Sequence, residues 1–205
     1  MIMELKNGLK MPIIGLGVWR MEGKSIRDLI LNAIKIGYRH FDCAGVGATA
    51  SALDQDGVLE IDTTISLKPP GMLWKIWFQW IWFAVLESGE ACQIETHPYF
   101  QRDSLVKFCQ KHGICVTAHT PLGGAVANTE WFGSVSCLDD PVLKGLAQKY
   151  KKTVAQLVLR WGIQRNSVVI PKSSKLERLE ENFHVFGFEL TKEDMELIKG
   201  VDRKL

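Results

Sequence analysis

The stretch with the clearest chemical potential is 170–182, IPKSSKLERLEEN, where a strand leads through a basic turn into a helix. Ser167 to Pro171 is β-branched and stops at a proline, and apolar residues then recur at helical spacing from Lys175 to Val185. Lys172 and Ser173 stand where the strand ends. A helix N-terminus offers N–H groups and partial positive charge, so the turn is suited to an anion such as phosphate. The alternative is an ordinary strand-to-helix turn with solvated lysines.

Composition limits the classes of protein that need to be considered. The chain has 205 residues, 46% of them hydrophobic, which is enough for one globular domain, or two small ones, with a sizeable core. A net charge of +2, with basic residues spread along the chain, predicts no nucleic-acid partner and no membrane partner. The run 72–86 contains Lys75 and Gln79, and it is shorter than the roughly 20 residues that span a bilayer as a helix.

Cysteine usage and the first residues bear on location. The N-terminal stretch MIMELKNGLK lacks an apolar signal-peptide core, which favours a cytoplasmic protein in a reducing compartment. The chain has five cysteines, an odd number, and none of them shows CxxC spacing: Cys43, Cys92, Cys109, Cys115 and Cys137. We predict no metal site.

The elements that position the basic turn begin with a hairpin, because KNGLK at 6–10 contains an Asn-Gly pair. Apolar patterns then predict a strand, a helix and a strand at Pro12–Val18, Ser25–Ile36 and Tyr38–Asp42. Asp42 therefore ends the second strand, where α/β barrels place catalytic groups.

The middle of the chain is less regular. Residues 45–56 are small and polar and predict a loop, while 58–67 is too mixed to assign. Four of the seven tryptophans then fall within nine residues, in a run that is apolar on every side: Trp74, Trp77, Trp80 and Trp82. Such a run must be buried or it becomes an aggregation site. An aromatic ligand site is the alternative to core or misplaced sequence.

Alternation of strands and helices returns in the second half. Strands are predicted at 93–96, 114–119 and 167–171, and helices at 101–112, 142–150, 153–163 and 175–185, with a last helix ending at Asp202. In the helix at 101–112, Leu105, Phe108 and Cys109 are predicted to face inward. Asp140 is suited to cap the helix that follows it, with Pro141 at the first position.

These residues resemble a known family. Residues 1–44 and 93–204 resemble the aldo-keto reductases, in particular the aldose-6-phosphate reductase branch that includes mannose-6-phosphate reductase and sorbitol-6-phosphate dehydrogenase. The matching blocks follow in family order: LKNGLKMPIIGLGVW, GYRHFDCA, QIETHPYFQ, HTPLGG, LVLRWGIQR and IPKSSKLERLEENF. The resemblance implies a (β/α)8 barrel that binds NADP(H) across the C-terminal ends of its strands. The family fold binds its cofactor without a Rossmann glycine fingerprint, and in this sequence GLG at 15–17 never completes GxGxxG.

The resemblance also implies roles for individual residues. The 2′-phosphate of NADP(H) would be held by Lys172, Ser173 and Arg178, with Glu181 and Asn182 near the adenine. Gln93 matches the residue that binds the nicotinamide carboxamide, and the loop along the cofactor would contain Thr120, Leu122 and Gly124. His119 stands where many relatives stack an aromatic on nicotinamide, and the alternative is a partly buried histidine that ends a strand. His97 fits a structural hydrogen bond better than catalysis.

The catalytic match is incomplete. In the family, hydride comes from the nicotinamide while a tyrosine protonates the carbonyl oxygen, helped by a lysine that pairs with an aspartate and by a histidine that orients the substrate. Asp42 matches the aspartate. The block that carries the tyrosine, lysine and histidine is missing, because Ala44 leads into residues 45–67, which resemble a later family loop. Lys68 belongs to that later context and is rejected as the lysine, and 68–90 matches nothing in the family.

The expected fold is therefore a single truncated α/β domain, an incomplete (β/α)8 TIM barrel with about five of eight strands and an N-terminal β-hairpin. Strands one, two, six, seven and eight remain neighbours, because strand eight pairs with strand one. Two free edges predict self-association or pairing with a full-length relative. By family the chain reduces an aldose 6-phosphate, a small sugar phosphate, to a polyol phosphate with NADP(H), with catalysis impaired or lost. The alternative is a non-catalytic interaction protein or an unstable splice product that pairs with a full-length relative.

Overall fold

A two-stranded antiparallel hairpin opens the chain. The computed structural model describes residues 1–6, 8, 10–18, 24–43, 64–67, 91–124 and 136–203. Strands β1 (Ile2–Glu4) and β2 (Lys10–Pro12) pair with Met3 opposite Met11. Gly8 lies between them with a φ of 80°, which glycine adopts without steric cost. The predicted hairpin is confirmed.

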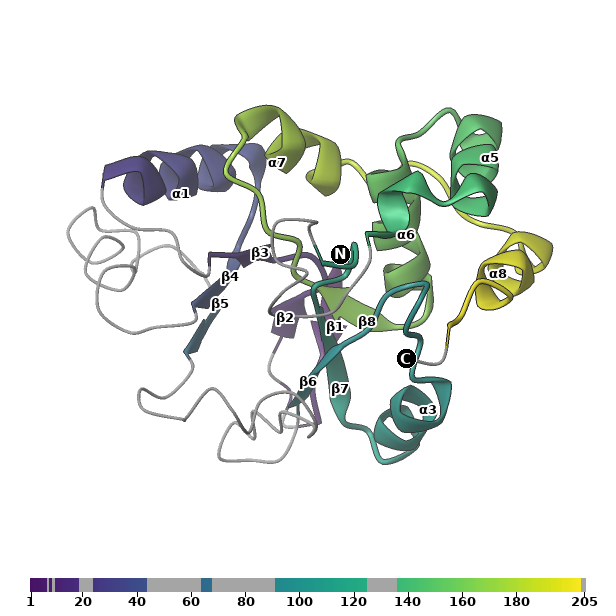
Figure 1. The fold of residues 1–205 in the computed structure, drawn as a ribbon. Helices are drawn as coiled ribbons and strands as arrows, with labels where there is room; N and C mark the ends of the chain where they lie inside the picture. The colour runs from purple at the N-terminus through teal and green to yellow at the C-terminus, as the bar shows by residue number, and fades with distance from the viewer. Residues whose placement is uncertain are drawn as a thin grey trace.

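Within the described residues, six parallel strands follow the hairpin (Figure 1). They are β3 (Leu16–Gly17), β4 (His40–Cys43), β5 (Thr64–Leu67), β6 (Ala91–Glu95), β7 (Cys115–His119) and β8 (Ser167–Val169). They form two ladders, β3-β4-β5 and β6-β7-β8. A parallel bridge from Ile14 to Val169 joins the ladders, and Gly15 N–H donates to the Val169 carbonyl at 2.9 Å. The last strand therefore lies beside the first, as predicted.

Strand β5 adds to the five strands that the sequence predicted. It lies in the segment that the sequence could not assign, and it pairs with β4 so that His40 lies opposite Thr64. Among the described strands, β5 and β6 each pair on one side only. The described fold is thus a partial parallel α/β arrangement with an N-terminal hairpin. The predicted loop at 45–56 and the tryptophan run lie outside the described residues.

Helices cover the outer side of these strands (Figure 1). They are α1 (Lys24–Ile36), α3 (Asp103–Lys111), α5 (Pro141–Tyr150), α6 (Val154–Gln164), α7 (Leu176–Phe183) and α8 (Lys192–Lys199), with a short 3₁₀ helix η4 (Cys137–Asp139). Helix α1 packs on α7, α3 on β7, and α6 on β8, while α5 contacts both α6 and α8. None of the helices in the described ranges is long and apolar enough to cross a bilayer.

Local sequence explains where several helices begin. The Asp140 side chain accepts hydrogen bonds from the backbone of Val142 and Leu143, with Pro141 at the start of α5. This confirms the predicted cap. Thr153 and Gln156 form a capping box that opens α6.

Packing between elements is close at several points. A Cβ added at Gly162 of α6 would lie 2.8 Å from Val169 Cγ1, so α6 approaches β8 as closely as a glycine allows.

In α3 the buried residues are Val106 and Cys109. Phe108 is 54% exposed and its ring lies 4.3 Å from that of His112, so the prediction that Phe108 faces inward is wrong.

Candidate functional site

Buried polar side chains meet on the inner side of the parallel strands. Asp42 of β4 and Gln93 of β6 are only 5% and 6% exposed, and Gln93 Nε2 donates to Asp42 Oδ2 at 3.3 Å. Strands β4 and β6 belong to different ladders, so this bond joins two distant parts of the strand array. Thr117 of β7 is in register with Gln93 and is also buried. Thr117 was not predicted as a site residue, although Cys115, Thr117 and His119 share one face of their strand.

His40 lies two residues before Asp42 and is fully buried. Burial lowers the pKa of its imidazole, an effect that the nearby Asp42 carboxylate partly opposes. A Cβ at Gly15 would stand 2.7 Å from His40 Nδ1, so the imidazole fills the space beside a glycine. The floor of the site therefore carries a neutral histidine at neutral pH.

Gly17 separates Asp42 from the basic turn. Gly17 is opposite Asp42 in the β3-β4 pairing, and its N–H donates to the Pro171 carbonyl at 3.1 Å. A Cβ at Gly17 would lie 3.2 Å from the Ile170 carbonyl oxygen and 3.7 Å from Lys172 Cβ. Strand β4 and the turn after β8 thus flank one closely approached glycine.

The turn that follows β8 prepares the start of α7. Lys172 is exposed, whereas Ser173 is 8% exposed and its Oγ accepts from Lys175 N–H at 3.1 Å. Lys175 is the cap residue of α7 and makes no side-chain cap hydrogen bond. Arg178 is exposed in the first turn of the helix. An N-terminus without a capping side chain and with basic residues around it is suited to an anion.

The remaining candidates on α7 are held by α6. The Glu181 carboxylate accepts from Thr153 Oγ1 at 2.7 Å, and its backbone carbonyl accepts from Gln156 Nε2 at 3.0 Å. Asn182 is 4% exposed. Thr153 and Gln156 were not predicted in this role, although their spacing is typical of a capping box.

The loop after β7 lies at the same end of the strands, since His119 is in register with Glu95 of β6. His119 is partly buried, and its Nδ1 lies 3.0 Å from Thr120 Oγ1. Thr120 has a φ of 51°, and its carbonyl accepts from Gly123 N–H at 3.0 Å, which closes a tight turn. The loop continues through Leu122, which is partly buried, and Gly124, which is buried.

The sequence-predicted site residues therefore lie on parallel strands or follow them, with Asp42 near the end of β4 and Gln93 in the middle of β6. Direct contact joins Asp42 with Gln93, while Gly17 lies between Asp42 and Lys172. Ser173 belongs to the same turn as Lys172. Arg178, Glu181 and Asn182 lie on α7, and His119 to Gly124 on the loop after β7.

The chain has three tyrosines, and the structure describes all of them. The Tyr38 hydroxyl donates to the Leu179 carbonyl at 3.0 Å, and the Tyr99 hydroxyl donates to Asp140 Oδ2 at 2.9 Å. The Tyr150 hydroxyl donates to the Asp194 carboxylate. Burial raises the pKa of Tyr38 far above its usual range and that of Tyr99 to about 12. A tyrosine that donates a proton near neutral pH needs a shift in the opposite direction. None of the three is bonded to Asp42.

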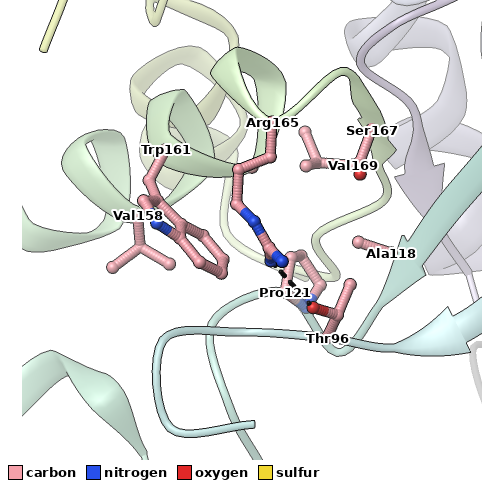
Figure 2. A pocket seen from close by; sticks show the side chains of 9 residues that line it. Thr96, Ala118, Pro121, Val158, Trp161, Arg165, Ser167 and Val169 are labelled. Carbon is pink, nitrogen blue, oxygen red and sulfur yellow. Dashed lines mark hydrogen bonds between the residues drawn. The ribbon is translucent and has the colours of Figure 1, made fainter. Parts of the chain in front are cut away.

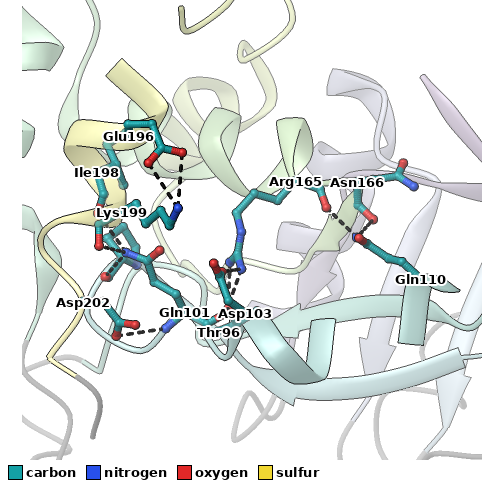
Figure 3. A network of polar contacts seen from close by, with 11 residues as sticks. Thr96, Gln101, Asp103, Gln110, Arg165, Asn166, Glu196, Ile198, Lys199 and Asp202 are labelled. Carbon is teal, nitrogen blue, oxygen red and sulfur yellow. Dashed lines mark hydrogen bonds and ion pairs between the residues drawn. The ribbon is translucent and has the colours of Figure 1, made fainter. Parts of the chain in front are cut away.

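A network on the outer side fixes the segment after β6 (Figure 3). Arg165 Nη2 donates to the Gln101 carbonyl at 2.9 Å and pairs with the Asp103 carboxylate. Gln101 Nε2 donates to the Ile198 carbonyl at 2.8 Å, which fastens α8 to this segment. Fully buried His97 bonds Glu95 at 3.2 Å, confirming its predicted structural role.

A narrow pocket lies between α6 and the outer side of β7 and β8 (Figure 2). Its lining includes Trp161 and Arg165, and Arg165 Nη1 donates to Thr96 Oγ1 at 3.4 Å. Ser167 Oγ also lines it, buried and without a hydrogen-bond partner. No candidate site residue borders this pocket, so it is a packing gap behind the strands.

Comparison with known proteins gives a consistent set of relatives. The model of the Aldo/keto reductase family matches residues 90–203. The NADP-dependent D-sorbitol-6-phosphate dehydrogenase of Malus domestica is 42% identical over 289 residues, covering 98% of this chain and 93% of that protein. Because 289 exceeds the 205 residues of this chain, that relative has residues in the aligned span without a counterpart here.

Two further comparisons agree. Aldo-keto reductase family 1 member D1 of Mus musculus is 48% identical over 115 residues, which is 55% of this chain and 35% of that protein. The crystal structure of an aldo/keto reductase from Brucella melitensis superposes with a TM-score of 0.79 at 27% identity. That alignment covers 98% of this chain and 99% of the bacterial chain.

Proposed function

Since the chain belongs to the aldo/keto reductase family, we propose that it is a cytoplasmic NADP(H)-binding member of the aldose-6-phosphate reductase branch whose carbonyl reduction is impaired or lost. The D-sorbitol-6-phosphate dehydrogenase among its relatives supports the branch and the choice of cofactor. The substrate class of any remaining activity is then an aldose 6-phosphate, reduced to a polyol phosphate.

The observation that carries cofactor binding is the start of α7. Its cap residue supplies no side-chain acceptor, exposed Lys172 stands in the turn before it, and exposed Arg178 lies in its first turn. The helix dipole and charge-assisted hydrogen bonds favour the 2′-phosphate that distinguishes NADP(H) from NAD(H). In the proposed complex, Gln93 holds the nicotinamide carboxamide, and the loop from His119 to Gly124 runs along the cofactor.

Loss of proton transfer is supported by the tyrosines. When NADP(H) is bound, it supplies hydride, but reduction also needs a proton for the carbonyl oxygen. Each tyrosine hydroxyl of this chain is bonded away from Asp42, and burial raises the pKa of Tyr38 and Tyr99. Asp42 accepts a hydrogen bond from Gln93, and none of the three tyrosines is bonded to it.

The test is a thermal melt of the full chain with NADPH or NADH, followed by a reductase assay with mannose 6-phosphate and glucose 6-phosphate. At a hundredfold excess over Kd, a ligand stabilises the folded state by about 2.7 kcal/mol, or roughly 5–10 °C for a chain of this size. We expect this rise with NADPH and not with NADH. The rise shrinks in Arg178→Met and persists in Lys107→Met, an exposed lysine on α3 that serves as the matched control.

Two results contradict the proposal separately. Equal shifts with both nucleotides, or no shift, would rule out the phosphate site. Turnover of a sugar phosphate that disappears in Lys172→Met would show that catalysis survives.

A second function is favoured by the strand edges. Strands β5 and β6 each pair on one side only within the described ranges, and such edges favour pairing with another chain. We propose that the chain associates with itself or with a full-length relative through these edges. Size-exclusion chromatography with light scattering, on the chain alone and co-expressed with a full-length reductase of this branch, should then give a dimer or hetero-oligomer. A monomer in both experiments would exclude it.

A further inference from the structure

We propose that Asp42 is a positioning residue for Gln93, which it holds in the orientation that receives the carboxamide of a bound nicotinamide. The inference rests on the proposed NADP(H) binding and assigns Asp42 a role in cofactor recognition. It replaces the role in proton transfer that the family resemblance implies for this aspartate.

The Asp42–Gln93 hydrogen bond bridges the inner side of the strand array. Asp42 lies on β4 and Gln93 on β6, and the pairing order places β3, β8 and β7 between those strands. Both side chains are more than nine-tenths buried. A hydrogen bond in such a dry setting is electrostatically stronger than one in water. The bond therefore limits how Gln93 can turn.

The chemistry of the two groups fixes which end of the amide faces Asp42. In this hydrogen bond Gln93 Nε2 donates and Asp42 Oδ2 accepts, so the NH₂ of Gln93 points to Asp42 and the carbonyl Oε1 points away. Oε1 accepts no hydrogen bond from the described residues, and it is not among the sealed polar atoms that lack partners. It is therefore reachable by solvent or a ligand.

This orientation suits a carboxamide. Gln93 Nε2 has two hydrogens, and one is used by Asp42. The second hydrogen and Oε1 form one edge with a donor and an acceptor, and the ligand carboxamide offers the complementary pair. Without Asp42 the amide could rotate and present the wrong order of groups. An orientation fixed before binding lowers the entropy that the complex must lose.

The surroundings separate this role from acid–base chemistry. Two residues deeper on β4, burial lowers the pKa of His40, which favours a neutral ring. Thr117, in register with Gln93, completes the buried polar group. In the proposed role, Asp42 acts on the cofactor through its hydrogen bond to Gln93.

The experiment compares two ligands by isothermal titration calorimetry on the full chain. NADPH contains the nicotinamide, whereas adenosine 2′,5′-bisphosphate contains the phosphate-bearing half without it. Asp42→Leu should weaken NADPH about tenfold, which corresponds to one lost hydrogen bond, and leave the bisphosphate unchanged. Asp42→Asn keeps an oxygen acceptor in the same place and should restore most of the NADPH affinity. Gln93→Met should reproduce the selective loss seen with Asp42→Leu.

Each other result decides against the inference. Equal weakening of both ligands in Asp42→Leu would mean a structural role, and a melt of each variant without ligand measures that contribution. If Asp42→Asn fails like Asp42→Leu, the charge and not the oriented bond matters. If the unaltered chain binds the bisphosphate as tightly as NADPH, the nicotinamide is not held and only the phosphate site remains. If neither ligand binds, the proposed function itself is wrong. If Asp42→Leu does not fold, the NADPH and bisphosphate affinities of Asp42→Asn and Gln93→Met test the inference.

Discussion

Replacing Tyr38 with phenylalanine tests how α7 is held on the strands. Tyr38 is fully buried next to β4, its hydroxyl donates to the Leu179 carbonyl at 3.0 Å, and its ring lies 4.9 Å from that of Phe183. Tyr38→Phe keeps the ring and removes only the hydroxyl. A buried neutral hydrogen bond contributes about 0.5–1.5 kcal/mol, and Leu179 lies inside α7, where its carbonyl keeps a helical partner. We therefore expect a loss of about 1 kcal/mol in the free energy of unfolding.

Urea denaturation followed by far-UV circular dichroism measures this loss, with the slope of the transition unchanged. Tyr99→Phe provides the comparison, because Tyr99 donates to the Asp140 carboxylate and hydrogen bonds to charged groups contribute about 1.5–3 kcal/mol. Tyr99→Phe should cost more than Tyr38→Phe, and Tyr38→Ala, which empties a buried site, should cost about 3–5 kcal/mol. A Tyr38→Phe variant as stable as the unaltered chain would refute the described docking of α7.

Three further changes have definite signs. Burial raises the thiol pKa of Cys92 and Cys137 to about 12 and of Cys115 to about 11, from 9.0, so the unfolded chain releases these protons first. Urea titrations should show a constant free energy of unfolding below pH 9 and, above it, a fall of about 1.4 kcal/mol per pH unit for each thiol. The fall should be less steep in Cys137→Ala. A flat profile up to pH 11 would contradict the burial of these thiols. Gly162→Ala should lower the free energy of unfolding by about 1–3 kcal/mol, because its Cβ meets Val169. Gly145→Ala has open space around it in α5 and should raise that free energy by up to about 1 kcal/mol. Thermal melts that shift both variants in the same direction would refute the close packing of α6 on β8. Asp140→Ala removes both the cap of α5 and the acceptor of the Tyr99 hydroxyl. In urea denaturation it should lower the free energy of unfolding by at least about 2 kcal/mol, more than Tyr99→Phe does. Equal losses in the two variants would mean that the cap contributes nothing.

The sequence predicted elements whose evidence is local. The Asn-Gly pair, the Asp140 cap and the apolar periodicity of α6 and α7 each lie within a few residues, and the structure confirms those elements. Strand β5 was missed because TISL has no decisive pattern, and its state depends on the edge of β4 beside it. Phe108 was misplaced because α3 turns Val106 and Cys109 toward the strands, a rotation set by packing and not by periodicity.

The candidate site shows the same limit. Individual matches to family motifs predicted Asp42 and Gln93. Asp42 lies near the end of β4, whereas Gln93, which was predicted to begin its strand, lies in the middle of β6. Their contact could not be predicted, because it depends on the curvature of five strands between residues 51 positions apart. Thr153 and Gln156 were missed as supports of α7 for the same reason, since they act through Glu181 on another helix.

These contacts support the proposal that cofactor binding outlasts catalysis in this chain. The proposed phosphate site needs β8, its turn and the start of α7, and α7 accepts hydrogen bonds from Tyr38, Thr153 and Gln156. The family mechanism that the resemblance implies needs a tyrosine beside Asp42, and the three tyrosines of this chain are bonded elsewhere in the fold. The two functions rest on different elements, so the loss of one leaves the physical basis of the other intact. An NADPH-dependent rise in melting temperature without turnover is the result that this division of the site predicts.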